Sequence, residues 1–244
     1  MNNSLSALPY VPDSTLVLVF SDADAVPKTD WLRFLVGPLG DASLTVSTGF
    51  RWYLPGIGFA SQLRAAWDTS IATLLGNHDQ NFAWGGSMAI RQEEFKRLNI
   101  RDVWQNAVSD DYTLTNAVRQ AGGKIRFEPR CLLASREESS LREFFSWSNR
   151  QIIITRVHAS QLWRLGLGAH LFYSLTFLVG LGVILESLAG NPSKPITALL
   201  ASAPLICVQL IGVAKGLIRL RVAQTCFPQE ESSILRNGSA YWKL

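Results

Sequence analysis

The sequence predicts an α/β domain over residues 1–140, followed by a transmembrane helical hairpin over residues 166–214. Two observations favour this fold class. In the first half of the chain, short runs rich in β-branched and aromatic residues alternate with segments whose apolar residues recur at helical spacing. Two long apolar runs then follow, and charged residues make up only 17% of the chain, against roughly 25% in a soluble domain.

Periodicity, capping residues and turn residues predict the individual α/β elements. The run Leu16–Phe20 is apolar throughout, which indicates a strand buried on both faces in the middle of a parallel sheet. A helix over 59–75 is expected to bury a broad apolar face that includes Ile71 and Leu74. The other predicted elements are a helix over 31–36, a strand over 44–53, a short strand ending at residue 90, helices over 91–98 and 110–121, and a strand over 124–133 interrupted by Pro129.

The first candidate site is Asp22-Ala23-Asp24, which follows the predicted strand 16–20 directly. Open α/β sheets bind ligands outside the carboxyl ends of their strands, so these carboxylates would lie where such sheets usually have their active sites. Two carboxylates one residue apart can converge on a hard divalent cation, the usual partner of nucleotide phosphates. The alternative is a solvated acidic turn that forms only local hydrogen bonds.

The second candidate site is Asp110-Asp111, at the start of the predicted helix 110–121. Capping alone could explain it, because Ser109 or Asp110 at the N-cap and an acidic first turn both stabilise a helix. However, a Trp84-Gly85-Gly86 turn and a later Arg150-Gln151 pair accompany the acidic sites in a fixed order. That order is more informative than any one motif.

The last third of the chain has the composition of a membrane region. Residues 141–165 mix aromatic and aliphatic residues with arginines, as an amphipathic helix in the bilayer headgroup region would; an ordinary packed helix is the alternative. The runs Gly166–Ala189 and Ile196–Ala214 would extend about 36 and 28 Å as helices, enough to cross a bilayer. Two buried core helices could share this composition.

The distribution of basic residues predicts the orientation and excludes one class of partner. Most of the basic residues near the two spans lie on their outer flanks, whereas the connecting turn holds only Lys194, so the positive-inside rule places the α/β domain and a tail over 215–244 in the cytosol. The net charge is +4, but the Lys and Arg residues are dispersed. We therefore expect no nucleic acid partner. The flanking residues are Arg156, Arg164, Lys215, Arg219 and Arg221.

Taken together, these motifs resemble the processive-type family 2 glycosyltransferases, in particular ceramide glucosyltransferases and their bacterial relatives. The resemblance spans about residues 16 to 160. It implies a GT-A (nucleotide-diphospho-sugar transferase) fold, a UDP-sugar donor, Mg²⁺ or Mn²⁺, and inversion at the anomeric carbon. The runs that carry it are Phe20-Ser-Asp-Ala-Asp24, Asp30-Trp-Leu-Arg33, Gly49-Phe-Arg-Trp-Tyr53, Phe82-Ala-Trp-Gly-Gly-Ser-Met-Ala-Ile-Arg91, Val108-Ser-Asp-Asp-Tyr112 and Arg150-Gln151.

The resemblance also implies a role for each matched residue. Asp22 and Asp24 match the Asp-x-Asp motif that holds the metal and the donor, with Asp24 as the direct metal ligand. Asp111 matches the general base that takes the proton of the acceptor hydroxyl. The pair Gly85-Gly86 would let the backbone approach the sugar closely, and Arg150 would clamp the pyrophosphate.

The resemblance has two departures and leaves the acceptor open. Trp147 and Gln151 stand where the family's Gln/Arg-x-x-Arg-Trp motif has Gln or Arg and Trp. The family also places uridine-binding strands and a first essential Asp upstream of Asp-x-Asp, so we expect the chain to match only the carboxyl-terminal part of such an enzyme. A site beside interfacial aromatic residues and a hairpin favours a lipid hydroxyl as acceptor, such as that of ceramide or diacylglycerol, with glucose as the expected sugar.

Two other readings of the sequence stay open. Haloacid-dehalogenase-like phosphatases also place Asp-x-Asp-x-Thr/Val after a buried strand, and the run from Asp22 to Val26 fits that pattern. That reading leaves the Trp84-Gly85-Gly86 turn and the membrane hairpin unexplained. The non-enzymatic reading is an inactive, truncated glycosyltransferase remnant that only inserts in the membrane.

Overall fold

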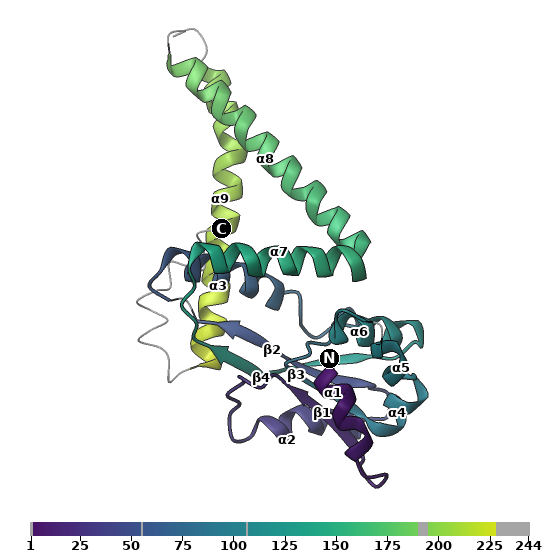
Figure 1. Cartoon of the computed structure of the whole chain (residues 1–244). Coiled ribbons are helices and arrows are strands. Elements are labelled where there is room, and N and C mark those ends of the chain that lie inside the picture. The colour runs from purple at the N-terminus through teal and green to yellow at the C-terminus, as the bar shows by residue number, and fades with distance from the viewer. Residues whose placement is uncertain (1, 55, 106, 190–194, 228–244) are drawn as a thin grey trace.

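A computed structural model describes residues 2–54, 56–105, 107–189 and 195–227. Its fold is a mixed α/β domain built on a four-stranded sheet, from which two long apolar helices rise (Figure 1). The coarse prediction of an α/β domain followed by a helical hairpin is therefore confirmed. The elements are α1 Asn2–Ala7, η1 Leu8–Tyr10, β1 Val17–Ser21, α2 Trp31–Val36, η2 Gly37–Gly40, β2 Val46–Tyr53, α3 Phe59–Ala72, β3 Ser87–Arg91, α4 Gln92–Arg97, α5 Ile100–Gln105, α6 Asp110–Gln120, β4 Ile125–Ser135, α7 Leu141–His158, α8 Ser160–Leu188 and α9 Pro195–Cys226.

The sheet has the strand order β1-β3-β2-β4, and it is mixed. Strand β3 pairs antiparallel with both β1 and β2, whereas β2 and β4 are parallel. The prediction of a central, parallel strand at Leu16–Phe20 is therefore wrong. Among the described residues β1 is an edge strand in which only Leu18 is buried. An apolar run reports the composition of a strand but not the number or direction of its neighbours.

The pairing of β2 with β4 is interrupted at the position where Pro129 was expected to break the strand. Thr48 lies opposite Phe127 and Phe50 lies opposite Leu132, so Gly49 alone faces the bulged segment of β4. Proline cannot donate a hydrogen bond to the sheet ladder, which accounts for a bulge at this position.

The two faces of the sheet bury different sets of helices. Successive residues of β3 alternate between them: Ile90 packs with residues of α4, α5 and α6, and Ala89 packs with residues of α2. The buried face of α3 consists mainly of small residues, so the predicted apolar face is partly wrong. Ile71 and Leu74 are exposed. The helix packs closely against β2 through alanines, and its larger apolar side chains lie outside that contact.

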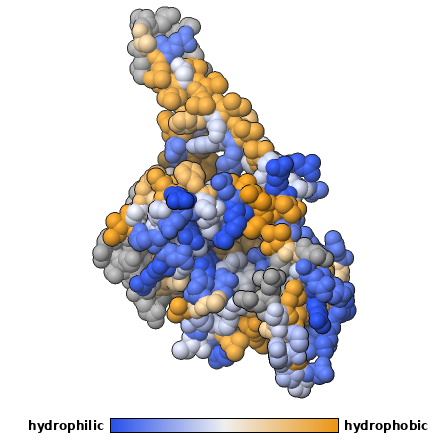
Figure 2. Space-filling view, in the orientation of Figure 1, coloured by the Kyte–Doolittle hydropathy of each residue, from blue (hydrophilic) through white to orange (hydrophobic). Residues whose placement is uncertain are grey.

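Helices α8 and α9 form the predicted hairpin, and each is long and apolar enough to cross a membrane. Few of their side chains are buried, and Figure 2 shows the projecting hairpin covered mainly by hydrophobic residues. The predicted turn at 190–195 lies outside the described residues except for Pro195, the first residue of α9.

Helix α9 continues beyond Ala214, the predicted end of the second span, as far as Cys226. Its last turns pack on the sheet, where Ala223 and Phe227 are buried with Trp52. This part of the predicted tail is therefore a helix that joins the hairpin to the α/β domain, whereas residues 228–244 lie outside the described chain.

The close approach of strands at Gly49 gives a test of the fold. A Cβ atom on Gly49 would overlap the Cys131 carbonyl oxygen and lie 2.6 Å from Ser87 Oγ. We expect Gly49→Ala to lower the free energy of unfolding by about 3 kcal/mol, because the paired strands must separate to admit the methyl group. Thermal unfolding of the full chain in detergent, followed by circular dichroism, measures the effect.

The matched control is Gly37→Ala. No atom lies within 4 Å of a Cβ placed there, and the backbone is already helical, with φ −49° and ψ −45°. This substitution should change the free energy of unfolding by less than about 1 kcal/mol, in the stabilising direction. Equal melting temperatures for the two variants would contradict the strand packing described here.

Candidate functional site

The predicted Asp-x-Asp pair lies in the loop that follows β1, at the edge of the sheet. The backbone N–H of Asp22 donates to the Gly86 carbonyl at 3.4 Å, next to the last residue pair of the β1–β3 ladder. Both aspartates are accessible, with side-chain exposures of 44% for Asp22 and 62% for Asp24. They are therefore open to a ligand from solvent.

Arg51 of β2 joins the two aspartates. Its Nη2 atom lies 2.8 Å from Asp22 Oδ2 and 3.0 Å from Asp24 Oδ1. Its Nη1 atom also lies 3.3 Å from Glu137 Oε1. Hydrogen bonds from Arg51 lower the pKa of the Asp24 carboxyl below its usual value.

Sequence reasoning did not assign a role to Arg51. The signal that could have found it is an arginine inside an otherwise apolar and aromatic strand, because a buried guanidinium requires carboxylate partners. Its side chain is only 13% exposed, and its guanidinium faces the rings of Trp84 and Tyr53 with 5.6 and 5.7 Å to their centroids. These contacts with aromatic rings help to hold the cation in place.

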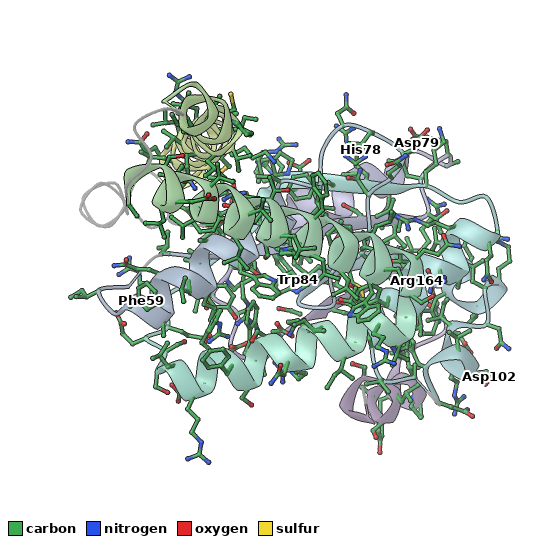
Figure 3. The ribbon with its side chains drawn as sticks, turned by 90° about the horizontal axis from the view of Figure 1, so that it is seen from above. Phe59, His78, Asp79, Trp84, Asp102 and Arg164 are labelled. Atoms are coloured by element: carbon green, nitrogen blue, oxygen red, sulfur yellow. The ribbon has the colours of Figure 1, made fainter. Side chains whose placement is uncertain are left out.

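The Trp84-Gly85-Gly86 turn lies between the two acidic sites. A Cβ atom on Gly86 would overlap the Trp84 ring and Asp22 Oδ2, and one on Gly85 would lie 2.9 Å from both carboxylate oxygens of Asp110. A larger residue at either position would therefore have to displace the side chains that lie against the turn. Figure 3, seen from above, shows Trp84 near the middle of the domain, with Phe59 and Asp102 toward opposite sides.

The second acidic site opens helix α6, as predicted, and Ser109 is its N-cap. The Asp111 carboxylate accepts hydrogen bonds from the Ser109 hydroxyl and from the Tyr112 backbone N–H at 2.7 Å. The backbone of Gly85 lies close enough to lower the pKa of the Asp111 carboxyl. Burial raises the pKa of the Asp111 carboxyl, and the hydrogen bonds oppose that shift only in part. The structure thus brings Asp111 close to Gly85 and Asp22 close to Gly86, the next residue of the same turn.

The predicted pyrophosphate clamp, Arg150, is not part of this cluster. It lies exposed on α7 and forms no ion pair or hydrogen bond with Asp22, Asp24 or Asp111. Helix α7 instead reaches the site through two other contacts. Tyr112 OH lies 3.1 Å from Thr155 Oγ1, and Trp147 packs edge-on against Tyr53.

The predicted metal site consists of two carboxylates. Among the described residues, no group of three His, Cys, Asp or Glu side chains is placed to hold a metal ion. Asp22 and Asp24 nevertheless fit Mg²⁺ or Mn²⁺, because such ions are commonly bound by one or two carboxylates together with phosphate oxygens of the substrate. The two aspartates could supply the protein's share of that ligand set.

A buried acid, Asp68, lies near Arg51 and Arg64. Asp68 of α3 is 8% exposed, its Oδ2 atom has no hydrogen-bond partner among the described residues, and burial raises the pKa of its carboxyl to about 8. The nearby arginines Arg51 and Arg64 oppose this shift but do not cancel it. Burial therefore favours the protonated form of Asp68 up to about neutral pH.

Comparison of the chain with protein-family models and with curated proteins gives no match.

The raised pKa of Asp68 predicts how stability depends on pH. Between the unfolded pKa near 4 and the folded pKa of about 8, the folded state keeps a proton that the unfolded state has lost. Stability should therefore fall as pH rises through this window, by at most about 1.4 kcal/mol per pH unit from this group, and the penalty should be constant above it.

Asp68→Asn tests that dependence, because an amide does not titrate. We expect the variant's melting temperature to match the wild type near pH 4 and to exceed it progressively toward pH 8. Asp102→Asn, an exposed substitution on α5, should give no such pH-dependent difference. A difference for Asp68→Asn that stays constant over pH 4–8 would contradict the burial-raised pKa.

Proposed function

We propose that this protein is a membrane-bound, inverting glycosyltransferase that transfers a hexose, with glucose expected, from a UDP-sugar to a lipid hydroxyl such as that of ceramide. One observation carries the proposal. Three motifs that are far apart in the sequence, Asp22–Asp24, Gly85–Gly86 and Asp111, meet at a single turn of the backbone. A capping aspartate or an isolated acidic turn would have no reason to lie beside the other two.

The first part of the mechanism concerns the donor. Asp22 and Asp24 would hold Mg²⁺ or Mn²⁺, which when bound supplies electrostatic stabilisation for the charge that develops on the departing UDP. Arg51 lies beside both aspartates and offers a second cation for the diphosphate oxygens. The family resemblance gives Gly85–Gly86 the role of letting the sugar approach the backbone. For that, the Trp84, Asp22 and Asp110 side chains that lie against the two glycines would have to move aside for the sugar.

The second part concerns the acceptor. The Asp111 carboxylate takes the proton of the acceptor hydroxyl while that oxygen bonds to the anomeric carbon and the bond from this carbon to the UDP oxygen breaks. Burial supports this role because a raised pKa makes a carboxylate a stronger base. Attack from the face opposite the leaving UDP inverts the anomeric configuration.

A lipid acceptor is supported by the position of α7. This helix lies across the domain at the base of α8 (Figure 1), and its exposed apolar residues include Phe145, Ile153 and Val157. Its inner side contacts the helix that carries Asp111, through Tyr112 and Thr155. A helix with one side on the site and an exposed apolar side suits the bilayer interface, where a lipid hydroxyl would be available.

The length and apolar character of α8 and α9 support an integral membrane location. We place α8 and the apolar part of α9 across the bilayer, with the α/β domain in the cytosol, because the basic residues lie on the domain side of the spans. No observation among the described residues favours the phosphatase alternative. The assay described next includes the result that would support it.

The direct test is incorporation of radiolabelled sugar. Membranes that contain the protein, incubated with UDP-glucose or UDP-galactose and Mn²⁺, should form a labelled glycolipid that membranes without it do not form. Chromatography of the lipid extract identifies the acceptor. Absence of labelled lipid with either donor would contradict the proposal, and release of phosphate from phosphoesters without UDP-sugar would indicate the phosphatase instead.

Asp111→Asn tests the general base. We expect transfer to fall by at least about 100-fold, because the amide cannot accept the hydroxyl proton, while binding of the UDP-sugar is largely retained. Asp79→Asn, an exposed substitution in the loop before the Trp84 turn, should leave transfer unchanged. Transfer by Asp111→Asn at the wild-type rate would disprove the base assignment.

A further inference from the structure

Arg51 occupies the position that a divalent cation would need. Its guanidinium bridges Asp22 and Asp24 at 2.8 and 3.0 Å, and these are the only carboxylates that the Asp-x-Asp motif supplies. A divalent ion bound by both aspartates would lie within a few ångströms of that positive charge. At such distances like charges repel strongly enough to change an equilibrium constant by tenfold or more.

The position of Arg51 is fixed by the fold, unlike that of a flexible surface arginine. The residue comes from β2 inside the sheet, its side chain is 13% exposed, and Trp84 and Tyr53 face its guanidinium. Burial opposes its charged form, but hydrogen bonds to Asp24 and the proximity of Tyr53 raise the pKa of Arg51 above its usual value. The guanidinium is therefore a permanent charge at this site.

Glu137 is a further carboxylate partner with which Arg51 can pair if it leaves the two aspartates. Glu137 Oε1 already lies 3.3 Å from its Nη1 atom, on the side away from the Asp22 contact, and Arg64 holds Glu137 at 2.8 Å. A rotation of the guanidinium that keeps the Nη1–Glu137 contact would give up the Nη2 contacts with Asp22 and Asp24, together with a further contact from Nη1 to Asp24 Oδ2 at 3.3 Å. The side chain can thus leave the aspartates without becoming an unpaired buried charge.

We infer that Arg51 is a counter-ion that pairs with the Asp22 and Asp24 carboxylates when no metal is bound. When a divalent cation and a nucleotide diphosphate bind together, Arg51 leaves the aspartates and binds the diphosphate. The inference rests on the proposed function for the nature of the anion. It makes Arg51 a donor-binding residue that couples metal binding to donor binding.

The charge balance of the cluster supports simultaneous arrival. The carboxylates of Asp22, Asp24 and Glu137 and the guanidiniums of Arg51 and Arg64 together leave one net negative charge, so a divalent cation alone would create an excess of positive charge. A diphosphate supplies the missing negative charge and gives the guanidinium a bidentate partner. The metal should therefore bind weakly by itself and much more tightly in the presence of the nucleotide.

Electron paramagnetic resonance of free Mn²⁺, with the purified full chain in detergent micelles, measures this coupling without any turnover. For the wild type, UDP should tighten Mn²⁺ binding by about tenfold. Arg51→Gln should tighten Mn²⁺ binding by about tenfold in the absence of UDP, because the competing charge is gone. UDP should then add less to the variant than to the wild type.

Two further variants separate this role from a structural one. Arg51→Lys keeps the charge but loses the fork that bridges both aspartates, so its Mn²⁺ affinity without UDP should fall between the other two. Arg97→Gln breaks an arginine–carboxylate pair with Glu94 on α4 and should leave Mn²⁺ affinity unchanged within about twofold. Helix content measured on each sample confirms folding.

The inference is overturned if Arg51→Gln binds Mn²⁺ no more tightly than the wild type, or if neither binds it. If Arg51→Gln does not fold, the inference is overturned when Arg51→Lys binds Mn²⁺ no more tightly than the wild type. Failure of the sugar-transfer assay together with the expected Mn²⁺ results would reject the proposed function and leave the role of Arg51 intact.

Discussion

The ion cluster around Arg51 is the constraint on which the candidate site depends. A guanidinium that is mostly buried must be paired, since an unpaired buried charge costs several kcal/mol. Its partners Asp22, Asp24 and Glu137 come from the loops that follow β1 and β4, the two outer strands of the described sheet. One side chain from the strand β2 therefore contacts both loops, and the ring of Trp84, which faces its guanidinium, adds the glycine turn to the same cluster.

The sequence predicted the local structure better than the sheet. Helix α6 is capped by Ser109 and is followed by Gly122 at φ +70°, and both features follow from side-chain chemistry within a few residues. The place of β1 at the edge of the sheet depends on which strands pair with it, and its apolar composition carries no such information. For the same reason the helix face of α3 was misjudged at Ile71: periodicity shows which residues share a side but not how closely the sheet approaches.

In the candidate site, too, the sequence predicted the local motifs better than the contacts between distant parts of the chain. Asp22, Gly86 and Asp111 were found because each is a short motif with its own local signature, and the fold then brought them together. Arg51 was missed because its role appears only when two loops separated by more than a hundred residues fold around it. Arg150 was assigned by its place in a motif, yet its side chain lies exposed on α7, where Thr155 makes the contact with the site.

The end of α9 links the hairpin to the Asp-x-Asp loop. Lys28, four residues after Asp24, donates to the Cys226 carbonyl at 2.6 Å at the carboxyl end of α9, where the helix dipole favours a cation. Its ammonium group also lies over the ring of Phe227, which is buried with Trp52, the residue next to Arg51. The hairpin is therefore packed on the strand that supplies Arg51 and hydrogen-bonded to the loop that Arg51 holds. A shift of α9 relative to the sheet would have to move one of these contacts, so the depth at which the hairpin lies in a bilayer and the geometry of the acidic pair cannot be set independently.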